Sequence, residues 1–399
     1  MYRYIIYSIC LSLITINLIF ILVISLLKDK KKELSKREVE NIAVLIPARN
    51  ESKVIEKLLI SLVNQSYKLN RSDIFVIVES KEDKTVDICE KYQVSYLIRT
   101  DFSVKTKGKA LDEAIKKIIN IKDYQMYFIF DADNRLENNF IEEMVNTYKK
   151  GYLYSIGKRE STNLNYNRFS YCSGLLFSLL NDLGNMKRQN KNKNIIASGT
   201  GYYIAGDIIN KFQGFPFDSL TEDYEFSLYA TLNHIPGYYN TNAVFYDEQP
   251  TDKKTTYTQR SRWCKGFQET RKKYMKEIKL NKRNISIYHE YIGVNHYISL
   301  IFVYALTLIS SIALTIYNSI NKLDFQIDLI VTICLLLIPL FVLSMIGLIL
   351  TNKINCKKIL KSYIYAIFYF PIYIFQFVPI YFIAKHKAIS WDVINHSGK

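Results

Sequence analysis

The sequence has 399 residues, enough for one large domain with membrane segments or for two domains. Lys and Arg outnumber Asp and Glu by 53 to 37, a basic excess that fits nucleic acid, anionic lipid or an acidic substrate as partner. The six cysteines are scattered without a C-x-x-C pair. This spacing excludes a disulfide framework or a zinc site and fits a reduced cytosolic catalytic part.

Residues 4–27 carry no charge and are mostly apolar. They are long enough to span a bilayer, which takes roughly 20 residues. The alternative is a secretory signal peptide, but the apolar run is longer than a signal's and has no Ala-x-Ala cleavage site. Only Arg3 precedes the run, whereas six Lys or Arg lie in residues 28–37. By the positive-inside rule we expect a transmembrane helix at 1–27, an outside N-terminus, a basic linker at 28–40 and a cytoplasmic catalytic part.

From residue 41 to 252, strand-like and helix-like stretches alternate, as in an α/β domain, with helices expected at 85–92 and at about 166–186 among them. Polar residues close the first strands: Asn50 and Glu51 follow 42–46, Glu79 follows 74–78, and Asp131 and Asp133 follow 126–130. In an open α/β sheet, ligands bind at the carboxyl ends of the strands. We therefore expect a nucleotide along this sheet edge. No G-x-G-x-x-G follows the first strand, so a dinucleotide site is not expected.

The chain is organised around residues 126–134, with the sequence Met-Tyr-Phe-Ile-Phe-Asp-Ala-Asp-Asn. The short apolar run predicts a strand buried on both faces of a parallel sheet. Asp131 and Asp133 fall where it ends. Their hard oxygens suit Mg²⁺ or Mn²⁺, which in turn bind a diphosphate. Taken alone, an Asp-x-Asp triplet is also compatible with a solvated turn.

Two further motifs lie downstream. Residues 199–203 read Gly-Thr-Gly-Tyr-Tyr, where the glycines allow close backbone approach and the paired tyrosines are placed to flank a sugar. The alternative is a tight bulge in a strand. Residues 221–223 read Thr-Glu-Asp, in which Thr221 is typical of a helix N-cap with acidic residues in the first turn.

The last part of the chain is basic and then apolar. Residues 253–292 predict a basic amphipathic helix on the anionic cytoplasmic membrane surface, and nucleic acid is not expected because the chain is membrane-bound. Three apolar stretches follow within 293–384. Pro371 and Pro379 predict that the third is broken or re-entrant, so the side on which the tail 385–399 lies stays open.

Together these motifs resemble the membrane-embedded family 2 glycosyltransferases, among them the chitin, hyaluronan, cellulose and poly-N-acetylglucosamine synthases. The resemblance covers roughly 40–275 and implies an α/β GT-A (Rossmann-like) nucleotide-diphospho-sugar domain, in a multi-pass protein of the plasma membrane. Its carriers are Pro47-Ala48-Arg49-Asn50-Glu51, Lys107-Gly108, Asp131-Ala132-Asp133, Gly199-Thr200-Gly201, Thr221-Glu222-Asp223 and Gln259-Arg260-Ser261-Arg262-Trp263. The order and spacing of the last three after a strand-terminal Asp-x-Asp are specific.

The resemblance also implies roles for individual residues. Asp223, beside Glu222, is expected as the general base on the acceptor hydroxyl, so that in-line displacement inverts the anomeric centre. Asp133 is expected to bind Mg²⁺ or Mn²⁺, with Asp131 on the metal or the ribose. Arg262 is expected at the diphosphate.

The remaining implied contacts concern donor and acceptor. Lys107 is expected on a phosphate or the donor sugar, Gln259 near the donor, and Trp263 under the acceptor sugar. Glu79 stands where the family usually has an Asp that contacts uracil. Asp83 resembles a second recurrent aspartate, although an exposed acid at a helix start fits as well. The expected donor set is Pro47, Asn50, Glu51, Glu79, Lys107, Asp131 and Gln259, and the acceptor set is Gly199, Thr200, Gly201, Tyr202 and Trp263. Arg99, Arg159, His234 and Cys264 are interpreted as structural or surface residues.

Three functions remain open. A polymer synthase that uses a UDP-sugar, with UDP-GlcNAc or UDP-Glc favoured, is supported by the Gln-x-x-Arg-Trp motif. Four spans are few for an enclosed channel, which leaves room for an accessory membrane subunit or a homo-oligomer. Single transfer to a membrane lipid, as in the related ceramide glucosyltransferases, is the second hypothesis. The third is an inactive sugar-binding scaffold, against which the retained Asp131, Asp133, Asp223 and Arg262 argue.

Overall fold

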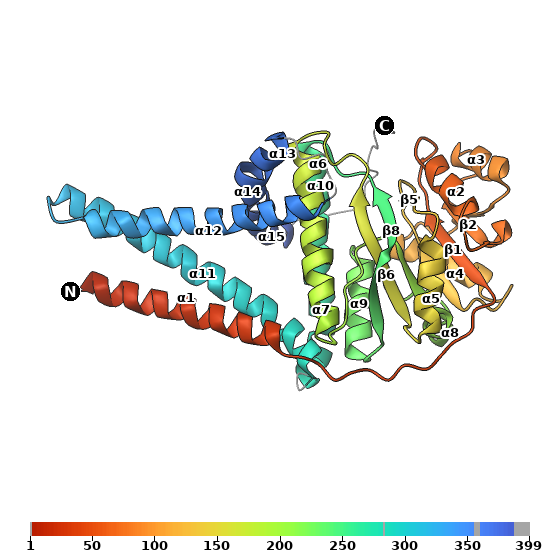
Figure 1. Ribbon diagram of the computed structural model, residues 1–399, viewed down its shortest axis with the longest axis horizontal. Coiled ribbons are helices and arrows are strands. Elements are labelled where there is room, and N and C mark those ends of the chain that lie inside the picture. The colour runs from red at the N-terminus through yellow and green to blue at the C-terminus, as the bar shows by residue number, and fades with distance from the viewer. Residues whose placement is uncertain (1, 282–283, 355–359, 387–399) are drawn as a thin grey trace. The chain divides into compact units, whose positions relative to one another are not determined.

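The computed structural model describes residues 2–281, 284–354 and 360–386 (Figure 1). The chain forms two compact units. One comprises Met1–Lys30 and Met275–Ile374, and the other Lys31–Tyr274 and Phe375–Lys399. Residues 387–399, most of the predicted tail, lie outside the described residues. The cysteines among the described residues, a set that leaves out Cys356, form no disulfide.

The second unit is built on an eight-stranded sheet of order β3-β2-β1-β4-β7-β6-β8-β5. Its strands are β1 (Ile42–Pro47), β2 (Ile74–Val78), β3 (Ser95–Ile98), β4 (Met126–Ile129), β5 (Arg135–Leu136), β6 (Tyr154–Ser161), β7 (Tyr202–Ala205) and β8 (Gly237–Asp247). The first four are parallel. β7 runs antiparallel to both β4 and β6.

The purely parallel surroundings predicted for β4 are therefore wrong on one side. The amide of Gly201 donates a hydrogen bond to the carbonyl of Ile129, at the carboxyl end of β4. The chain thus enters β7 at the end where β4 stops and can pair with it only by running back. The reversal places the 199–201 loop beside Asp131.

Both faces of the sheet are covered by helices, as the doubly buried pattern of β4 predicts. On one face lie α2 (Ile55–Val63), α3 (Thr85–Tyr92) and α5 (Phe140–Lys149). On the other lie α4 (Lys107–Ile118), α8 (Gly206–Phe212) and α9 (Glu222–Leu232). Along β1, Val44 and Ile46 join the first core while Ala43 and Leu45 join the second, because successive side chains of a strand point to opposite faces.

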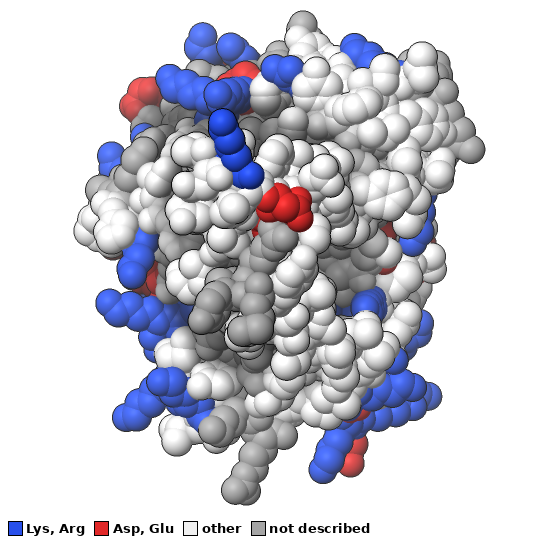
Figure 2. All heavy atoms as spheres, turned by 90° about the vertical axis from the view of Figure 1, so that its left-hand side faces the viewer, with Lys and Arg blue, Asp and Glu red and all other residues white. Residues whose placement is uncertain are grey.

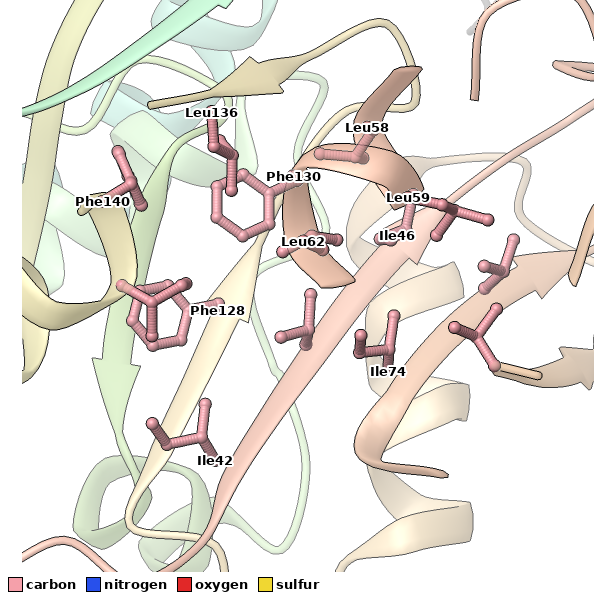
Figure 3. Close-up of a cluster of buried hydrophobic side chains, with 14 of the residues drawn as sticks. Ile42, Ile46, Leu58, Leu59, Leu62, Ile74, Phe128, Phe130, Leu136 and Phe140 are labelled. Atoms are coloured by element: carbon pink, nitrogen blue, oxygen red, sulfur yellow. The ribbon is translucent and has the colours of Figure 1, made fainter. Parts of the chain in front are cut away.

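The first core brings β1, β2 and β4 against α2 and α5 (Figure 3). Phe128 and Phe130 stack with ring centroids 6.0 Å apart, and Phe130 meets Phe140 edge-on at 5.6 Å. Each fully buried aromatic ring of this kind contributes roughly 1.5–3 kcal/mol of transfer free energy. This packing fixes the end of β4, and with it the backbone that carries Asp131 and Asp133.

The remaining elements of this unit are mostly helical. A single helix predicted for 166–186 is instead α6 (Arg168–Ser178), a π-helical segment η2 (Leu179–Asn185) and α7 (Met186–Asn190). A short 3₁₀ turn, η1 (Arg71–Asp73), precedes β2, and α10 (Lys253–Leu280) carries the Gln259–Trp263 motif. The last helix, α15 (Phe377–Ala384), also belongs to the second unit.

The first unit contains α1 (Tyr2–Leu26), α11 (Ile285–Ile320), α12 (Gln326–Lys353), α13 (Leu360–Ile364), the π-helical η3 (Tyr365–Tyr369) and most of α14 (Phe370–Phe375). Within the described residues, four segments are long and apolar enough to cross a membrane, namely Tyr7–Leu26, Ser299–Ile320, Gln326–Lys353 and Leu360–Ala384. The fourth is interrupted at η3 and at Gln376, in keeping with the predicted break.

Polar contacts join three of the apolar helices. The buried carboxylate of Asp328 in α12 accepts hydrogen bonds from the Tyr7 hydroxyl of α1 and the Asn318 amide of α11, both at 2.8 Å. Apart from this contact, uncharged side chains dominate these helices. On the face shown in Figure 2, residues other than Lys, Arg, Asp and Glu cover most of the middle, and Lys and Arg lie mainly toward the edges. A buried carboxylate that accepts hydrogen bonds from two other helices holds the three helices together in otherwise apolar surroundings.

Candidate active site

Lys107, the first residue of α4, ties three of the motifs together. Its Nζ donates hydrogen bonds to Asp131 Oδ1 at 2.5 Å and to the Gly199 carbonyl at 2.7 Å, and lies 3.8 Å from Glu222 Oε1. The residue is 8% exposed. Burial alone lowers the pKa of the Lys107 ammonium, but Asp131 and Glu222 outweigh it, so the net shift is upward and the group stays charged.

Glu222 and Asp223 open α9 beside this ammonium. Burial raises the pKa of Glu222 to about 7, opposed by Lys107 and reinforced by Asp223. The pKa of Asp223 is also raised, chiefly by burial, although backbone hydrogen bonds from Tyr224 and Gly199 oppose the shift. Two adjacent carboxylates whose pKa values are both raised are suited to holding or accepting a proton.

The 199–201 loop needs its glycines. Gly199 and Gly201 have φ of +85° and +68°, and a Cβ at Gly201 would lie 2.3 Å from the ring of Phe245. Thr200 is fully buried. Its hydroxyl accepts a hydrogen bond from the Asp131 amide at 2.8 Å and donates one to Asn134. The Thr200 side chain therefore braces the Asp-x-Asp turn, and its contact with an acceptor stays a prediction.

The prediction that Tyr202 and Tyr203 flank a sugar is wrong for Tyr203. Both rings are fully buried, on opposite faces of the sheet, because neighbouring residues of β7 alternate. The Tyr203 hydroxyl donates to the Tyr152 carbonyl at 2.8 Å. The Tyr202 hydroxyl has no hydrogen-bond partner among the described residues, and burial with nearby Glu222 and Asp223 raises its pKa well above the ordinary value.

Asp133 lies in a second charged cluster. Burial raises its pKa well above the ordinary value, and the carboxylates of Asp247 and Asp131 add to the shift. Arg159 of β6 balances part of this charge. Its Nε donates to Asp247 Oδ2 at 2.8 Å, and its Nη1 donates to the Ser198 carbonyl at 3.0 Å. Sequence reasoning gave Arg159 no role at the site, since one Arg within a strand carries no motif.

A small cavity opens beside Asp133. Its volume is about 190 Å³, and it is lined by Val54, Lys57, Asp133, Arg135, Thr162 and Glu248. In the described part of the chain no three His, Cys, Asp or Glu side chains form a ready metal cluster. Asp133, a half-buried carboxylate beside the carboxylates of Asp131 and Asp247, suits a cation whose other ligands come from a bound substrate or water.

The loop after β1 is held by Asp83, which is 7% exposed. This burial rules out the exposed helix-start interpretation. Asp83 Oδ2 accepts from the Asn50 amide and Oδ1 from the Thr85 amide, both at 2.9 Å, while Asn50 adopts a left-handed φ of +58°. Pro47 ends β1 on one side of this loop, and Glu51 begins the turn into α2.

Glu79, at the end of β2, forms an ion pair with the same loop. Arg49 Nε lies 2.8 Å from Glu79 Oε2. The other carboxylate oxygen, Oε1, is buried and has no hydrogen-bond partner among the described residues. Glu79 therefore retains one oxygen able to accept a hydrogen bond from a ligand.

Helix α10 packs against the start of α9. A Cβ at Gly266 would lie 2.6 Å from Thr221 Oγ1, so the two helices approach as closely as glycine allows. Thr221 is the N-cap residue of α9, as predicted, but its hydroxyl makes no capping hydrogen bond. Buried Glu225 adds a link, accepting from Lys273 Nζ at 2.6 Å.

Gln259, Arg262, Trp263 and Gly266 follow an i, i+3, i+4, i+7 pattern and so share one face of α10. Trp263 meets Phe177 edge-on at 5.7 Å, and the ring of Phe177 lies under the Arg159 guanidinium at 3.6 Å. Arg262 Nε is buried without a hydrogen-bond partner among the described residues. The motif thus reaches the Asp133 cluster through Phe177 and Arg159.

Residues 40–266, more than half of the chain, match the family described as "Glycosyltransferase like family 2". The chain belongs to this family. A "Probable glycosyltransferase YdaM" of Bacillus subtilis is 26% identical over 83% of this chain and 79% of its own length. A "Beta-monoglucosyldiacylglycerol synthase" of Trichormus variabilis is 20% identical over 56% of this chain and 48% of its own.

Among solved structures, the mannosyltransferase PcManGT of Pyrobaculum calidifontis, in complex with GDP-Man and Mn²⁺, aligns with a TM-score of 0.53 and 14% identity. The alignment covers 83% of this chain and 99% of PcManGT. The similarity establishes the GT-A-like fold of this family 2 glycosyltransferase.

The close approach of α10 to α9 predicts an effect of Gly266→Ala. The added Cβ would push α10 away from Thr221 and shift the Gln259–Trp263 face, so we expect kcat/KM for sugar transfer to fall roughly ten- to hundredfold. Gly184→Ala is the matched control, because its Cβ would meet only the Leu179 carbonyl at 3.5 Å. Equal activity of the two variants would show that the close approach is not needed.

Proposed function

We propose that the chain is an inverting, metal-dependent hexosyltransferase that moves a sugar from a UDP-sugar to an acceptor at a membrane, with its catalytic unit in the cytoplasm. The observation that carries this proposal is the contact of one buried ammonium, Lys107, with Asp131, Gly199 and Glu222. It gathers the donor and catalytic motifs of the family at a single sheet edge.

Asp223 is the proposed base. It takes the proton of the acceptor hydroxyl while that oxygen attacks the anomeric carbon, and the bond to the diphosphate breaks to release UDP. The raised pKa of Asp223 supports this role, since a base works best when its pKa approaches the working pH. Lys107 orients the Glu222–Asp223 pair by holding Glu222. Attack on the anomeric carbon from the side opposite the departing diphosphate inverts the anomeric centre.

Donor binding is assigned to the ends of the parallel strands. Glu79 Oε1 has no hydrogen-bond partner among the described residues. This oxygen is proposed to accept a hydrogen bond from the base of the nucleotide. Asp133, with Asp131 on the metal or the ribose, would hold Mg²⁺ or Mn²⁺. Such a cation would neutralise the departing diphosphate. The Mn²⁺ in the PcManGT complex supports use of a divalent metal.

For the acceptor we propose a growing β-linked polysaccharide, on the strength of the Gln259–Trp263 motif in α10. An accessory subunit or a homo-oligomer would complete a channel around the polymer. A membrane lipid is the second candidate, and the relative that acts as a monoglucosyldiacylglycerol synthase favours it. Both acceptors use the same base and the same leaving group.

The proposal is tested by measuring UDP release from detergent-purified protein over a panel of UDP-sugars with Mg²⁺ or Mn²⁺, followed by mass spectrometry of the products. A ladder of sugars from one donor would establish polymer synthesis. A single sugar on a co-purified lipid would replace it with glycolipid synthesis. Absence of release with any donor, in membranes that retain lipids and partners, would contradict the transferase proposal.

Asp223→Asn is expected to lower kcat at least about a hundredfold, because the amide cannot accept the acceptor proton. UDP-sugar affinity should stay close to that of the unaltered protein, because we assign Asp223 to the acceptor hydroxyl and not to the donor. Calorimetric binding and single-turnover rates measure the two effects. Retention of most of the turnover would refute the base assignment.

The activity should depend on pH through the Glu222–Asp223 pair. Both folded-state pKa values are raised, so kcat/KM should fall on acidification at less acidic pH than for an isolated aspartate. Glu222→Gln removes the neighbouring negative charge, which lowers the pKa of Asp223. The acidic limb of the profile of kcat/KM against pH then moves to lower pH. A pH profile of both proteins checks the direction. A limb that does not move, or moves to higher pH, would contradict the coupling.

Asp133→Ala is expected to weaken metal-dependent binding of the donor. Titration of UDP in the presence of Mn²⁺ and again with EDTA separates the metal contribution, which should shrink in the variant. Lys57→Ala, on the wall of the same cavity but without a carboxylate, is the control. An unchanged difference between the Mn²⁺ and EDTA titrations would exclude Asp133 as the metal ligand.

A further inference from the structure

The last part of the fourth membrane-length stretch, Gln376 and α15, packs onto the motif helix. Ile380 and Ala384 of α15 form a buried cluster with Cys264 of α10, and Phe377 and Tyr381 pack against it. Residues 375–386 belong to the same compact unit as the catalytic domain. The contact therefore lies within one unit, although its two segments are more than 110 residues apart in the sequence.

Arg260 is the centre of this contact. It is 1% exposed and is the largest of the fully buried side chains. Its Nη1 donates a hydrogen bond to Gln376 Oε1 at 3.2 Å, and its guanidinium stacks over the ring of Phe377 at 4.6 Å. Further along α10, Gln268 Nε2 donates to the Tyr381 carbonyl at 2.7 Å.

These contacts use a separate face of α10. Arg260, Cys264 and Gln268 are spaced i, i+4, i+8 and so form one stripe. The stripe of Gln259, Arg262, Trp263 and Gly266 lies on the other side of the helix and meets Thr221 and Phe177. Helix α10 is thus held between the proposed site on one face and α15 on the other.

We propose that Gln376 and α15 form a positioning element for the Gln259–Trp263 face, and that Arg260 is the positioning residue through which it acts. This inference rests on the proposed function for its catalytic consequence. A buried guanidinium has few ways to satisfy its donors, so its partners fix the rotation and the axial position of the helix. A shift of about 1 Å in groups aligned for reaction costs up to roughly a hundredfold in rate.

The test uses Trp263 as a reporter. The chain has two tryptophans, and Trp391→Phe leaves Trp263 as the only one. In that background, Phe377→Leu keeps apolar volume but loses the aromatic face under Arg260. Phe377→Tyr keeps the face, and Phe382→Leu, at an exposed phenylalanine of the same helix, is the control. Tryptophan emission, kcat, KM and UDP affinity are measured for each protein.

We expect Phe377→Leu to change the Trp263 emission and to lower kcat by roughly tenfold, with UDP affinity within about twofold of the background protein. Phe377→Tyr should restore both emission and kcat, and Phe382→Leu should leave both unchanged. Rescue by the tyrosine separates positioning from a general loss of packing. A variant that merely loosens the fold would lose UDP affinity together with kcat.

Unchanged Trp263 emission in Phe377→Leu would overturn the proposal, whether or not turnover falls. A changed emission with unaltered kcat would overturn the positioning role. If the background protein transfers no sugar at all, the proposed function fails, while the emission comparison still decides whether α15 sets the position of α10.

Discussion

The catalytic unit depends on one buried ammonium. Removing a charge from water costs several kcal/mol, and an ion pair offsets that cost only when its geometry is good and its remaining donors are satisfied. Lys107 meets both conditions, because Asp131, the Gly199 carbonyl and Glu222 surround its Nζ. Deleting one partner of such a pair leaves the others buried and uncompensated. The Gly-rich loop, the Asp-x-Asp turn and the start of α9 are therefore coupled through a single side chain.

Helix α10 is held to this centre by shape rather than by charge. Gly266 has no side chain where α10 meets Thr221, and the resulting contact is closer than any other residue would permit. Lys273 and buried Glu225 add an ion pair farther along the helix. On the opposite stripe, Arg260 is buried against Gln376 and Phe377. The residues that carry the motif are fixed from two sides, so changes outside the motif can alter it.

Local pattern was enough to predict much of the fold. The apolar runs at β1, β2 and β4 and the helix Thr85–Tyr92 follow from periodicity and strand-end polarity, and the structure has them. The reversal of β7 was not predictable, because pairing direction depends on where the preceding loop enters the sheet. The break of the predicted helix at Leu179 and the lack of a capping hydrogen bond from the Thr221 hydroxyl also arise from tertiary packing.

In the candidate site, too, short motifs could be predicted from the sequence, whereas contacts between distant residues could not. The Asp-x-Asp, Gly-Thr-Gly and Thr-Glu-Asp motifs were visible because several residues share a short spacing, and the structure brings one group of each motif to the Lys107 ammonium. Arg159 and Asp247 were not visible, since each stands alone in its strand and only the register of β6 with β8 makes them neighbours. For the same reason the side-chain burial of Thr200 and Tyr203 could not be deduced from their motif.

Charge balance connects these observations. The carboxylates of Asp131, Asp133, Glu222, Asp223 and Asp247 lie near one another, and Lys107 and Arg159 are the two cations whose charges act on them most directly. Two positive charges do not neutralise five carboxylates, and the raised pKa values of Asp133, Glu222 and Asp223 are the expected response. The excess negative charge lies at two places, beside Asp133 and beside Asp223. Beside Asp133 it favours an added cation, and beside Asp223 it favours a proton. A site that binds a metal–diphosphate on one side and removes a proton on the other needs this division.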